Sequence, residues 1–157
     1  MLRCKVIVVD RTRSPFLREG EGVYLERLRR YVKTDWVEVK PARMTKGRAE
    51  KEIRREEGRA LSKRLGPSDM AIALDRTGKM YDSEGLARRL ERLSRRSGGS
   101  VCFLIGGPLG LSREVVDRSA EVLSLSRLTL THEMSRLVLL EQLYRACTIL
   151  AGEKYHK

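Results

Sequence analysis

The strongest constraint on the fold is a set of short segments that are apolar at nearly every position. Val101–Ile105 and Met70–Leu74 contain only apolar residues and cysteine, and Leu2–Val9 ends in four β-branched residues. Strands without polar residues on either face are typical of the centre of a parallel sheet that helices cover on both sides. Segments with helical spacing separate these runs. The alternation therefore predicts an α/β domain built on a mostly parallel sheet flanked by helices.

The expected elements follow the chain in order. Strands are expected at Leu2–Val9, Trp36–Val39, Met70–Leu74, Val101–Ile105 and near Val122–Leu125. Helices are expected at Val23–Lys33 and Ala49–Leu65, after Ser83 and Ser112 as N-caps, and at Glu133–Ala151, with a polar loop at Asp10–Gly22. The 157 residues suit one ordinary domain, and no repeat or low-complexity linker divides them. We expect a single domain over 1–157.

Basic residues dominate the chain, with 33 Lys and Arg against 21 Asp and Glu and a formal net charge of +12. Residues 1–66 contain 19 basic and 10 acidic side chains, whereas residues 101–157 contain 7 and 6. A basic surface attracts polyanions, and contacts with phosphate release counterions. We predict a nucleic-acid partner that the basic N-terminal part contacts, although arginine-rich codon composition is an alternative source of the charge.

Other residue types exclude several classes of site. Cys4, Cys102 and Cys147 are far apart and lack CxxC spacing, so we expect buried thiols rather than disulfides. His132 and His156 are the only histidines, and no metal site is expected. No apolar run approaches the roughly 20 residues of a membrane span, and the N-terminus lacks the features of a signal peptide. We expect a cytoplasmic protein without membrane contact.

The last expected helix is apolar around most of its circumference. Between Met134 and Leu150 its apolar residues occupy more than one helical stripe. A helix of this kind is buried on two sides. The sheet covers one side, and in so small a domain the second cover is expected to be another protomer. This predicts a homodimer, with a fully enclosed helix as the alternative.

Two loops that follow apolar strands are candidates for a ligand site. The glycine-rich loop Gly106–Gly110 follows one strand, and Asp75 follows another. The GGxxG spacing is neither the dinucleotide motif GxGxxG nor a P-loop. Ligands bind beyond the carboxyl ends of strands in open α/β sheets, so both loops are expected to border one pocket. The alternatives are a tight strand-to-helix turn at the glycines and a turn-capping role for Asp75.

A third candidate is the segment Leu123–His132, in which Leu alternates with Ser or Thr. This alternation is typical of an amphipathic strand. The same hydroxyl and backbone groups could instead line a pocket for a polar cofactor. His132 is either a general base or a structural residue near a helix N-terminus.

Several short motifs occur together in an order that resembles a known family. They are Leu-Asp-x-x-Gly-Lys at 74–79, Ser-Glu-Gly-Leu-Ala at 83–87, Ile-Gly-Gly-x-x-Gly-Leu at 105–111, Leu-Ser-x-Ser-x-x-Thr-Leu at 123–130, Glu-Gln-Leu-Tyr-Arg-Ala at 141–146 and the final Tyr155-His156-Lys157. The combination is similar to the ribosomal RNA large-subunit methyltransferase H family, of the SPOUT (trefoil-knot) class. Residues before 70 agree with the family in length, element order and basic character rather than in individual motifs.

The resemblance implies a basic N-terminal part, 1–66, and a part at 67–157 that threads into a trefoil knot and binds S-adenosylmethionine. It also implies an obligate homodimer. Carried onto this sequence, the cofactor contacts fall on Leu74, Gly106, Leu125, Ser126, Arg127, Leu128, Thr129 and Leu130. These residues lie in the three segments already selected as candidates.

The resemblance further implies methylation of N3 of a pseudouridine in helix 69 of 23S ribosomal RNA, in assembled ribosomes. Methyl transfer to an imide nitrogen needs positioned reactants and removal of the imide proton. The catalytic candidates are His132, Arg136, Tyr155 and His156, and Arg145 is a further candidate to hold RNA phosphate. Alternative functions are methylation of another RNA such as transfer RNA, and a non-catalytic module that binds RNA or the ribosome.

Two positions depart from the family pattern. Thr131 stands where the family usually has proline before the histidine, and we expect a freer loop there. The first strand ends in Val9-Asp10-Arg11, where the family usually has a Gly-Lys turn. Because this loop could contact RNA, the substrate contacts are where the chain is expected to differ most.

Overall fold

The computed structural model describes residues 2–157 and alternates strands with helices throughout. In chain order the elements are β1 (Arg3–Val9), α1 (Pro15–Leu28), β2 (Lys33–Val39), α2 (Glu50–Ser62), β3 (Met70–Lys79), α3 (Ser83–Arg96), β4 (Val101–Ile105), α4 (Arg113–Arg118), β5 (Glu121–Leu123) and α5 (His132–Leu150). The strands form one parallel sheet in the order β2-β1-β4-β3-β5. The predicted α/β architecture is confirmed.

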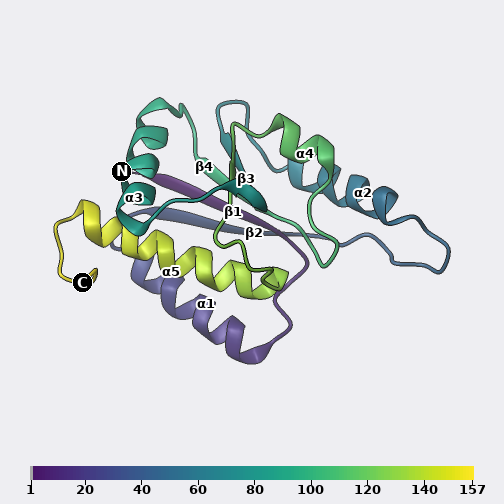
Figure 1. Ribbon diagram of the computed structural model, residues 1–157, viewed down its shortest axis with the longest axis horizontal. Helices are drawn as coiled ribbons and strands as arrows, with labels where there is room; N and C mark the ends of the chain where they lie inside the picture. The colour runs from purple at the N-terminus through teal and green to yellow at the C-terminus, as the bar shows by residue number, and fades with distance from the viewer. Residues whose placement is uncertain (1) are drawn as a thin grey trace.

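Helices cover both faces of the sheet (Figure 1). Successive side chains of a strand point to opposite faces, so β1 and β4 contribute to two cores. Val6 and Phe103 pack with α1, α3 and α5 on one face. Ile7 and Leu104 pack with α2 and with Val115 of α4 on the other. Every residue of β4 is buried, as expected for a central parallel strand.

The neighbours of α5 differ from the sequence expectation. This helix packs on the sheet and is flanked by α1 and α3, so its own chain covers much of its apolar circumference. A Cβ atom at Gly20 of α1 would lie 3.0 Å from Cδ1 of Leu137, which shows how closely α1 and α5 approach. The apolar character of α5 is therefore largely explained within one chain, and the homodimer stays a prediction that needs other support.

The predicted loop at 10–22 is wrong from Pro15 onward. The helix α1 begins at Pro15 and ends at Leu28, and β2 begins at Lys33 rather than at Trp36. Proline is favourable in the first turn of a helix, where its missing N–H has no partner to lose. Glycine within the segment suggests a loop, but at position 20 it serves close packing against α5. Tertiary contact thus overrides a weak local helix signal.

Two further boundaries differ from the predictions. The N-cap of α3 is Asp82, whose Oδ1 accepts the N–H of Gly85 at 2.6 Å, and not Ser83. The hydroxyl of Ser83 instead donates to Oε1 of Gln142 at 2.9 Å, which ties α3 to α5. Strand β3 continues to Lys79, well beyond the predicted end, with an irregular register against β5.

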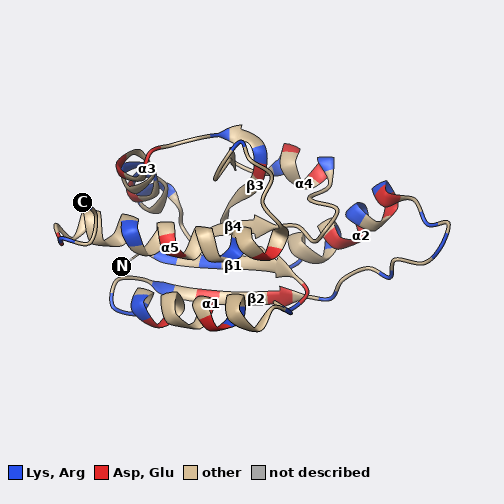
Figure 2. Ribbon diagram, turned by 60° about the horizontal axis from the view of Figure 1, so that its bottom comes forward, with Lys and Arg blue, Asp and Glu red and all other residues tan. Residues whose placement is uncertain are grey.

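The distribution of charged and sulfur-containing residues agrees with the sequence analysis. Figure 2 shows Lys and Arg spaced along the long connection between β2 and α2. The three cysteines are free and buried, as predicted, and burial raises the pKa of Cys102 to about 12 and that of Cys147 to about 11. Within residues 2–157, no helix is long and apolar enough to cross a membrane, and no three His, Cys, Asp or Glu side chains are grouped to hold a metal ion.

Candidate functional site

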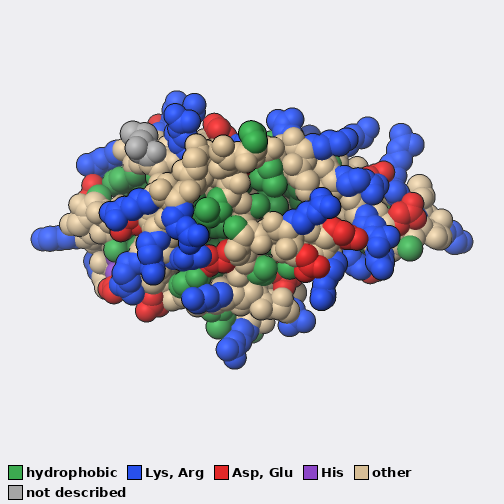
Figure 3. Space-filling model, turned by 90° about the horizontal axis from the view of Figure 1, so that it is seen from above, with side chains coloured by type: hydrophobic (Ala, Val, Ile, Leu, Met, Phe, Trp, Pro, Cys, Tyr) green, Lys and Arg blue, Asp and Glu red, His purple; other side chains and the backbone are tan. Residues whose placement is uncertain are grey.

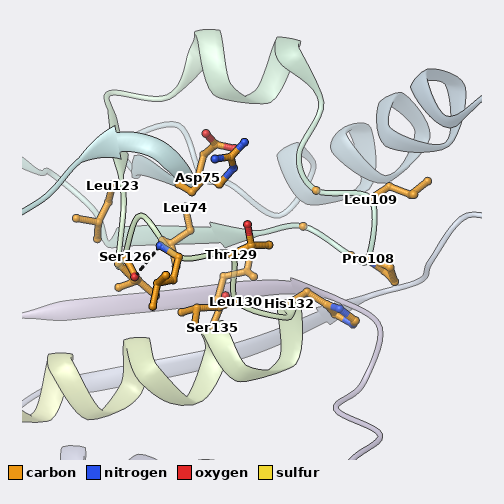
Figure 4. A pocket seen from close by; sticks show the side chains of 17 residues that line it. Leu74, Asp75, Pro108, Leu109, Leu123, Ser126, Thr129, Leu130, His132 and Ser135 are labelled. Carbon is orange, nitrogen blue, oxygen red and sulfur yellow. Dashed lines mark hydrogen bonds between the residues drawn. The ribbon is translucent and has the colours of Figure 1, made fainter.

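A hollow of about 330 Å³ lies at the carboxyl-end edge of the sheet, beside β3, β4 and β5 (Figure 4). Its walls are the turn in β3, the glycine-rich loop after β4, and the loop that connects β5 to α5. It is lined by Leu74, Asp75, Arg76, Ile105, Gly106, Gly107, Pro108, Leu109, Gly110, Leu123, Leu125, Ser126, Leu128, Thr129, Leu130, His132 and Ser135. The prediction that the loops after two of the strands border one pocket is confirmed.

The glycine-rich loop is both a tight turn and a wall of the hollow. The N–H of Gly110 donates to the carbonyl of Gly107 at 2.9 Å, and Gly110 has a φ of +82°, which glycine adopts without steric cost. A Cβ atom at Gly106 would lie 2.5 Å from the carbonyl carbon of Gly110. The loop can therefore fold back on itself only if position 106 has no side chain.

The segment after β5 is a loop and not an amphipathic strand. The strand covers only Glu121–Leu123. Beyond it, the Ser124 hydroxyl donates to the carbonyl of Ser126 at 2.9 Å, and the Ser126 hydroxyl accepts the N–H of Leu128 at 3.0 Å (Figure 4). The serines thus organise the loop, and its residues line the hollow as the pocket alternative predicted.

Asp75 combines the two roles that its sequence position suggested. Its Oδ2 accepts the backbone N–H of Thr77 at 3.0 Å and also the Thr77 hydroxyl, so the carboxylate caps its own turn. The same residue lines the hollow. The carboxylate is therefore held in place beside the site by a neighbouring residue.

His132 is the first residue of α5 and lines the hollow. Burial, and then the positive charge of Arg136, lower the pKa of His132 below its usual value, so the imidazole is neutral near pH 7. Thr131 caps the helix because its hydroxyl accepts the N–H of Met134 at 3.1 Å. The freer loop expected at Thr131 stays a prediction, and this hydrogen bond is the local contact that holds the residue before His132.

Arg136 is fully buried, with 0% of its surface exposed, and does not line the hollow. Its guanidinium donates to the carbonyl of Val9 at 2.6 Å, to the carbonyl of Asp10 at 3.1 Å and to the Thr12 hydroxyl at 2.9 Å. Asp10 has a φ of +68°, a conformation that Asp tolerates better than most residues. The interpretation of Arg136 as a group that contacts substrate is replaced by a structural one: it holds the end of β1.

The other catalytic candidates lie against the second half of α5. Glu141, which Tyr155 contacts, follows His132 by nine residues, or about 14 Å along the helix axis. The Tyr155 hydroxyl donates to Oε1 of Glu141 at 3.1 Å, and Arg145 contacts both Glu141 at 2.6 Å and Nδ1 of His156 at 3.4 Å. Burial, and then hydrogen bonds, raise the pKa of Tyr155 to about 12, so this phenol stays protonated. One chain therefore does not bring His132 together with Tyr155 and His156.

Seven of the eight expected cofactor residues line the hollow. They are Leu74, Gly106, Leu125, Ser126, Leu128, Thr129 and Leu130; Arg127 does not. Ser135 also lines the hollow and was not predicted, although it follows His132 by three residues and so shares its helix face. Glu133 was not predicted either; it accepts the N–H of Ser14 at 3.0 Å and so joins the start of α1 to the start of α5. No sequence signal reveals this contact, because Ser14 and Glu133 are so far apart in the chain.

Comparisons with known proteins were made on the sequence and on the fold. The family profile described as "Predicted SPOUT methyltransferase" matches residues 2–156. A protein of Anaeromyxobacter sp. (strain Fw109-5) named "Ribosomal RNA large subunit methyltransferase H" is 48% identical over 99% of this chain and 100% of its own length. A protein of the same name from Rubrobacter xylanophilus is 49% identical over 98% of each chain. The structure of a "Probable Methyltransferase" from Bordetella pertussis Tohama I is similar in fold, with a TM-score of 0.57 and 16% identity over 93% of this chain and 96% of that one.

Proposed function

Because this chain belongs to the SPOUT methyltransferase family, we propose that it transfers a methyl group from S-adenosylmethionine to N3 of a pseudouridine in helix 69 of 23S ribosomal RNA. The reaction takes place on assembled ribosomes in the cytoplasm, and residues 67–157 form the knotted cofactor-binding part of the domain. The observation that carries the proposal is the hollow at the carboxyl-end edge of the sheet, because seven of the eight residues matched to family cofactor contacts line it.

The residues of the hollow suit S-adenosylmethionine. Leu74, Ile105 and Leu125 offer apolar surface for an adenine ring, while Ser126 and Thr129 add hydroxyl groups. The volume of about 330 Å³ falls within the usual range for small-molecule sites. Gly106 lets the loop after β4 fold tightly against Gly110, and this turn forms one wall of the hollow. When bound, S-adenosylmethionine supplies an electrophilic methyl group attached to a positively charged sulfur.

The chain must also prepare the acceptor nitrogen. An imide N–H is a poor nucleophile until its proton is removed, and a positioned base typically contributes roughly 10²- to 10⁴-fold. His132 suits this role because it borders the hollow and its lowered pKa keeps the imidazole neutral near pH 7. Thr131 fixes the start of α5 and so limits where this imidazole can lie. The remaining contribution of the site is orientation of the two reactants.

In a homodimer, one site would combine His132 of one protomer with Tyr155 and His156 of its partner, which a single chain keeps apart. Phe16 and Val23 lie seven residues apart on one stripe of α1 and are 68% and 44% exposed, and Leu128 at the hollow is 76% exposed. A partner protomer that packs on this stripe of α1 would remove both side chains from water. Since Tyr155 and His156 lie against the second half of α5, away from His132, a two-fold dimer is an arrangement that can bring one protomer's tail to its partner's hollow.

The proposed reaction is tested on ribosomes that lack the modification. The purified protein is incubated with labelled S-adenosylmethionine and either intact ribosomes, free 23S ribosomal RNA or transfer RNA, and the modified nucleoside is identified by mass spectrometry. We expect N3-methylated pseudouridine from helix 69 and the highest rate on intact ribosomes. Preferred methylation of transfer RNA would redirect the proposal to another substrate. Absence of cofactor binding in calorimetry would favour the non-catalytic module.

The shared site is tested by mixing two inactive variants. His132→Ala and His156→Ala are unfolded, mixed and refolded together, so that about half of the dimers contain one copy of each. If each site takes His132 from one protomer and His156 from its partner, every mixed dimer has one intact site, and the mixture recovers about a quarter of wild-type activity. No recovery beyond the two separate variants would contradict this arrangement.

A further inference from the structure

We propose that Arg76 and Arg127 form a phosphate-binding site for the RNA strand, immediately beside the cofactor hollow. The inference rests on the proposed function, because it supplies a contact for an RNA substrate of that reaction. Arg76 lies in the turn of β3 and Arg127 in the loop between β5 and α5, so the two side chains come from segments about 50 residues apart in the chain.

The two arginines line a second hollow of about 540 Å³. Its other lining residues are Thr77, Gly78 and Met80, so no carboxylate borders it. Arg76 also lines the cofactor hollow, which makes the two hollows neighbours with a shared wall. A ligand in the second hollow would therefore lie directly beside a group bound in the first.

The charges of both guanidinium groups are unbalanced within residues 2–157. Neither Arg76 nor Arg127 takes part in an ion pair or donates a side-chain hydrogen bond there, and both are exposed. By contrast, three arginines of α3 each pair with a glutamate; these are Arg88, Arg89 and Arg95. The nearest carboxylate along the chain, on Asp75, accepts two hydrogen bonds from Thr77. An anion that binds between the two guanidinium groups is attracted by both charges.

The backbone holds the two arginine-bearing segments together. The N–H of Ser124 donates to the carbonyl of Lys79 at 2.9 Å, across the end of the β3–β5 pair. A Cβ atom at Gly78 would lie 2.6 Å from the backbone of Val122, so the two segments are in direct contact there. The turn of β3 and the loop that carries Arg127 thus form one unit, and their arginines face the same hollow as a consequence of the fold.

RNA phosphate fits this site better than the cofactor does. Arg127 was matched to the family's cofactor contacts, yet it does not line the cofactor hollow and lines the adjoining one. Guanidinium groups bind phosphate oxygens in pairs, and an RNA strand that presents a base to the first hollow carries a phosphate on each side of that base. Figure 3 shows that Lys and Arg clearly outnumber Asp and Glu on the face seen from above, which favours the approach of a polyanion.

The test compares Arg76→Gln, Arg127→Gln and the double variant with wild type. Arg96→Gln is the matched control, because Arg96 is exposed and unpaired within the described residues. It is the last residue of α3, just before the amino end of β4 and therefore away from the hollow. Affinity for a fluorescent RNA stem-loop of the helix 69 sequence is measured at several salt concentrations. Calorimetry gives the affinity for S-adenosylmethionine.

We expect each single variant to weaken RNA binding roughly tenfold and to reduce the slope of log Kd against log salt by about 0.7 to 0.9. The control should change neither quantity appreciably, and cofactor affinity should stay within about twofold in Arg127→Gln, because Arg127 does not line the cofactor hollow. Arg127→Lys should keep the salt slope, since it keeps the charge. Its RNA affinity should fall, because a lysine ammonium lacks the planar fork with which a guanidinium binds two phosphate oxygens.

Two results would overturn the site. Equal weakening by Arg96→Gln would show a general effect of charge, and a loss of cofactor affinity that matches the loss of RNA affinity would make Arg127 a cofactor contact. Failure of the proposed function is a separate result, because RNA binding is measured without methyl transfer. A wild-type protein that binds the stem-loop but methylates neither intact ribosomes nor free 23S ribosomal RNA would leave the phosphate site standing and refute the proposed reaction.

Discussion

Replacement of Gly106 by alanine tests whether the close approach within the glycine-rich loop creates the cofactor hollow. The added Cβ atom would lie 2.5 Å from the carbonyl carbon of Gly110 and 2.8 Å from the backbone nitrogen of Leu111. Ordinary van der Waals contact begins at 3.4 Å, so one of the two backbones must move by about 0.9 Å. Forcing an added methyl group into a packed region typically costs about 1–3 kcal/mol. We expect the Kd for S-adenosylmethionine to rise about 100-fold, or about 2.7 kcal/mol.

The neighbouring glycines supply controls within the same loop. A Cβ atom at Gly107 would meet only side chains, with Oε1 of Glu57 at 3.3 Å, so Gly107→Ala should change the Kd by no more than a few-fold. A Cβ atom at Gly110 would meet nothing within 4 Å, but its φ of +82° is unfavourable for alanine. The strain of about 1–2 kcal/mol corresponds to a five- to thirtyfold loss at most.

Calorimetric titration with S-adenosylmethionine measures the three affinities, and thermal unfolding without cofactor confirms that each variant is folded. We expect the affinity for S-adenosylmethionine to fall in the order Gly107→Ala, Gly110→Ala, Gly106→Ala. A folded Gly106→Ala protein with wild-type affinity would refute the claim that this loop forms a wall of the site. A larger effect at Gly110 than at Gly106 would show that the positive φ, and not the close approach, shapes the hollow.

Four further predictions concern buried or titrating groups. Arg136→Met should lower the free energy of unfolding by about 3–5 kcal/mol, since it leaves buried carbonyls without a donor, and urea unfolding measures the change. The rate of methyl transfer should fall only as the pH drops through the lowered pKa of His132, below about 6.5, and a pH profile of His132→Gln should lack that fall. Burial opposes the charge of Asp69, but its bond to Lys5 at 2.8 Å and two backbone N–H groups hold its pKa well below the usual 3.8. Because the folded pKa is the lower one, this carboxylate stabilises the fold fully above about pH 4 and loses its effect below, so the stability gap between wild type and Asp69→Asn should shrink on acidification. His156→Ala should lower methyl transfer far more than cofactor binding; equal loss of both would refute a role toward the substrate.

The central strands were predictable because burial on both faces leaves a signature in the sequence itself. For Val101–Ile105 the predicted strand and the observed β4 have the same bounds. The position of the hollow was also predictable, since parallel strands end at a common edge and ligands bind beyond their carboxyl ends. These inferences need only local patterns and one rule of sheet geometry.

Helix α1 was not predictable in the same way. Its segment, Pro15–Leu28, contains Gly20 and Gly22 and has little apolar periodicity, so its local preference for a helix is weak. The helix forms because it packs along α5, where Gly20 permits contact with Leu137. That partner lies more than a hundred residues later in the chain, beyond the reach of any window-based pattern.

Arg136 illustrates the same limit for the candidate site. An arginine on an apolar helix, close to a histidine, is reasonably interpreted as a group for phosphate or for a developing anion. The structure instead places it at the end of β1, more than 120 residues away in the chain, where it satisfies the carbonyls of Val9 and Asp10. Burial of a charged group is decided by such distant partners, and residue type alone does not reveal it.

The segment between β5 and α5 shows how one loop can serve two ligands. Ser126 and Leu128 line the cofactor hollow, whereas Arg127 between them lines the adjoining one. Neighbouring side chains of a loop held by backbone contacts point in different directions, so a motif matched as a block need not contact a single molecule. Under the proposed function, the positively charged sulfonium gains nothing from nearby cations, whereas an RNA phosphate is attracted by Arg76, which borders both hollows, and by Arg127, which borders only the second.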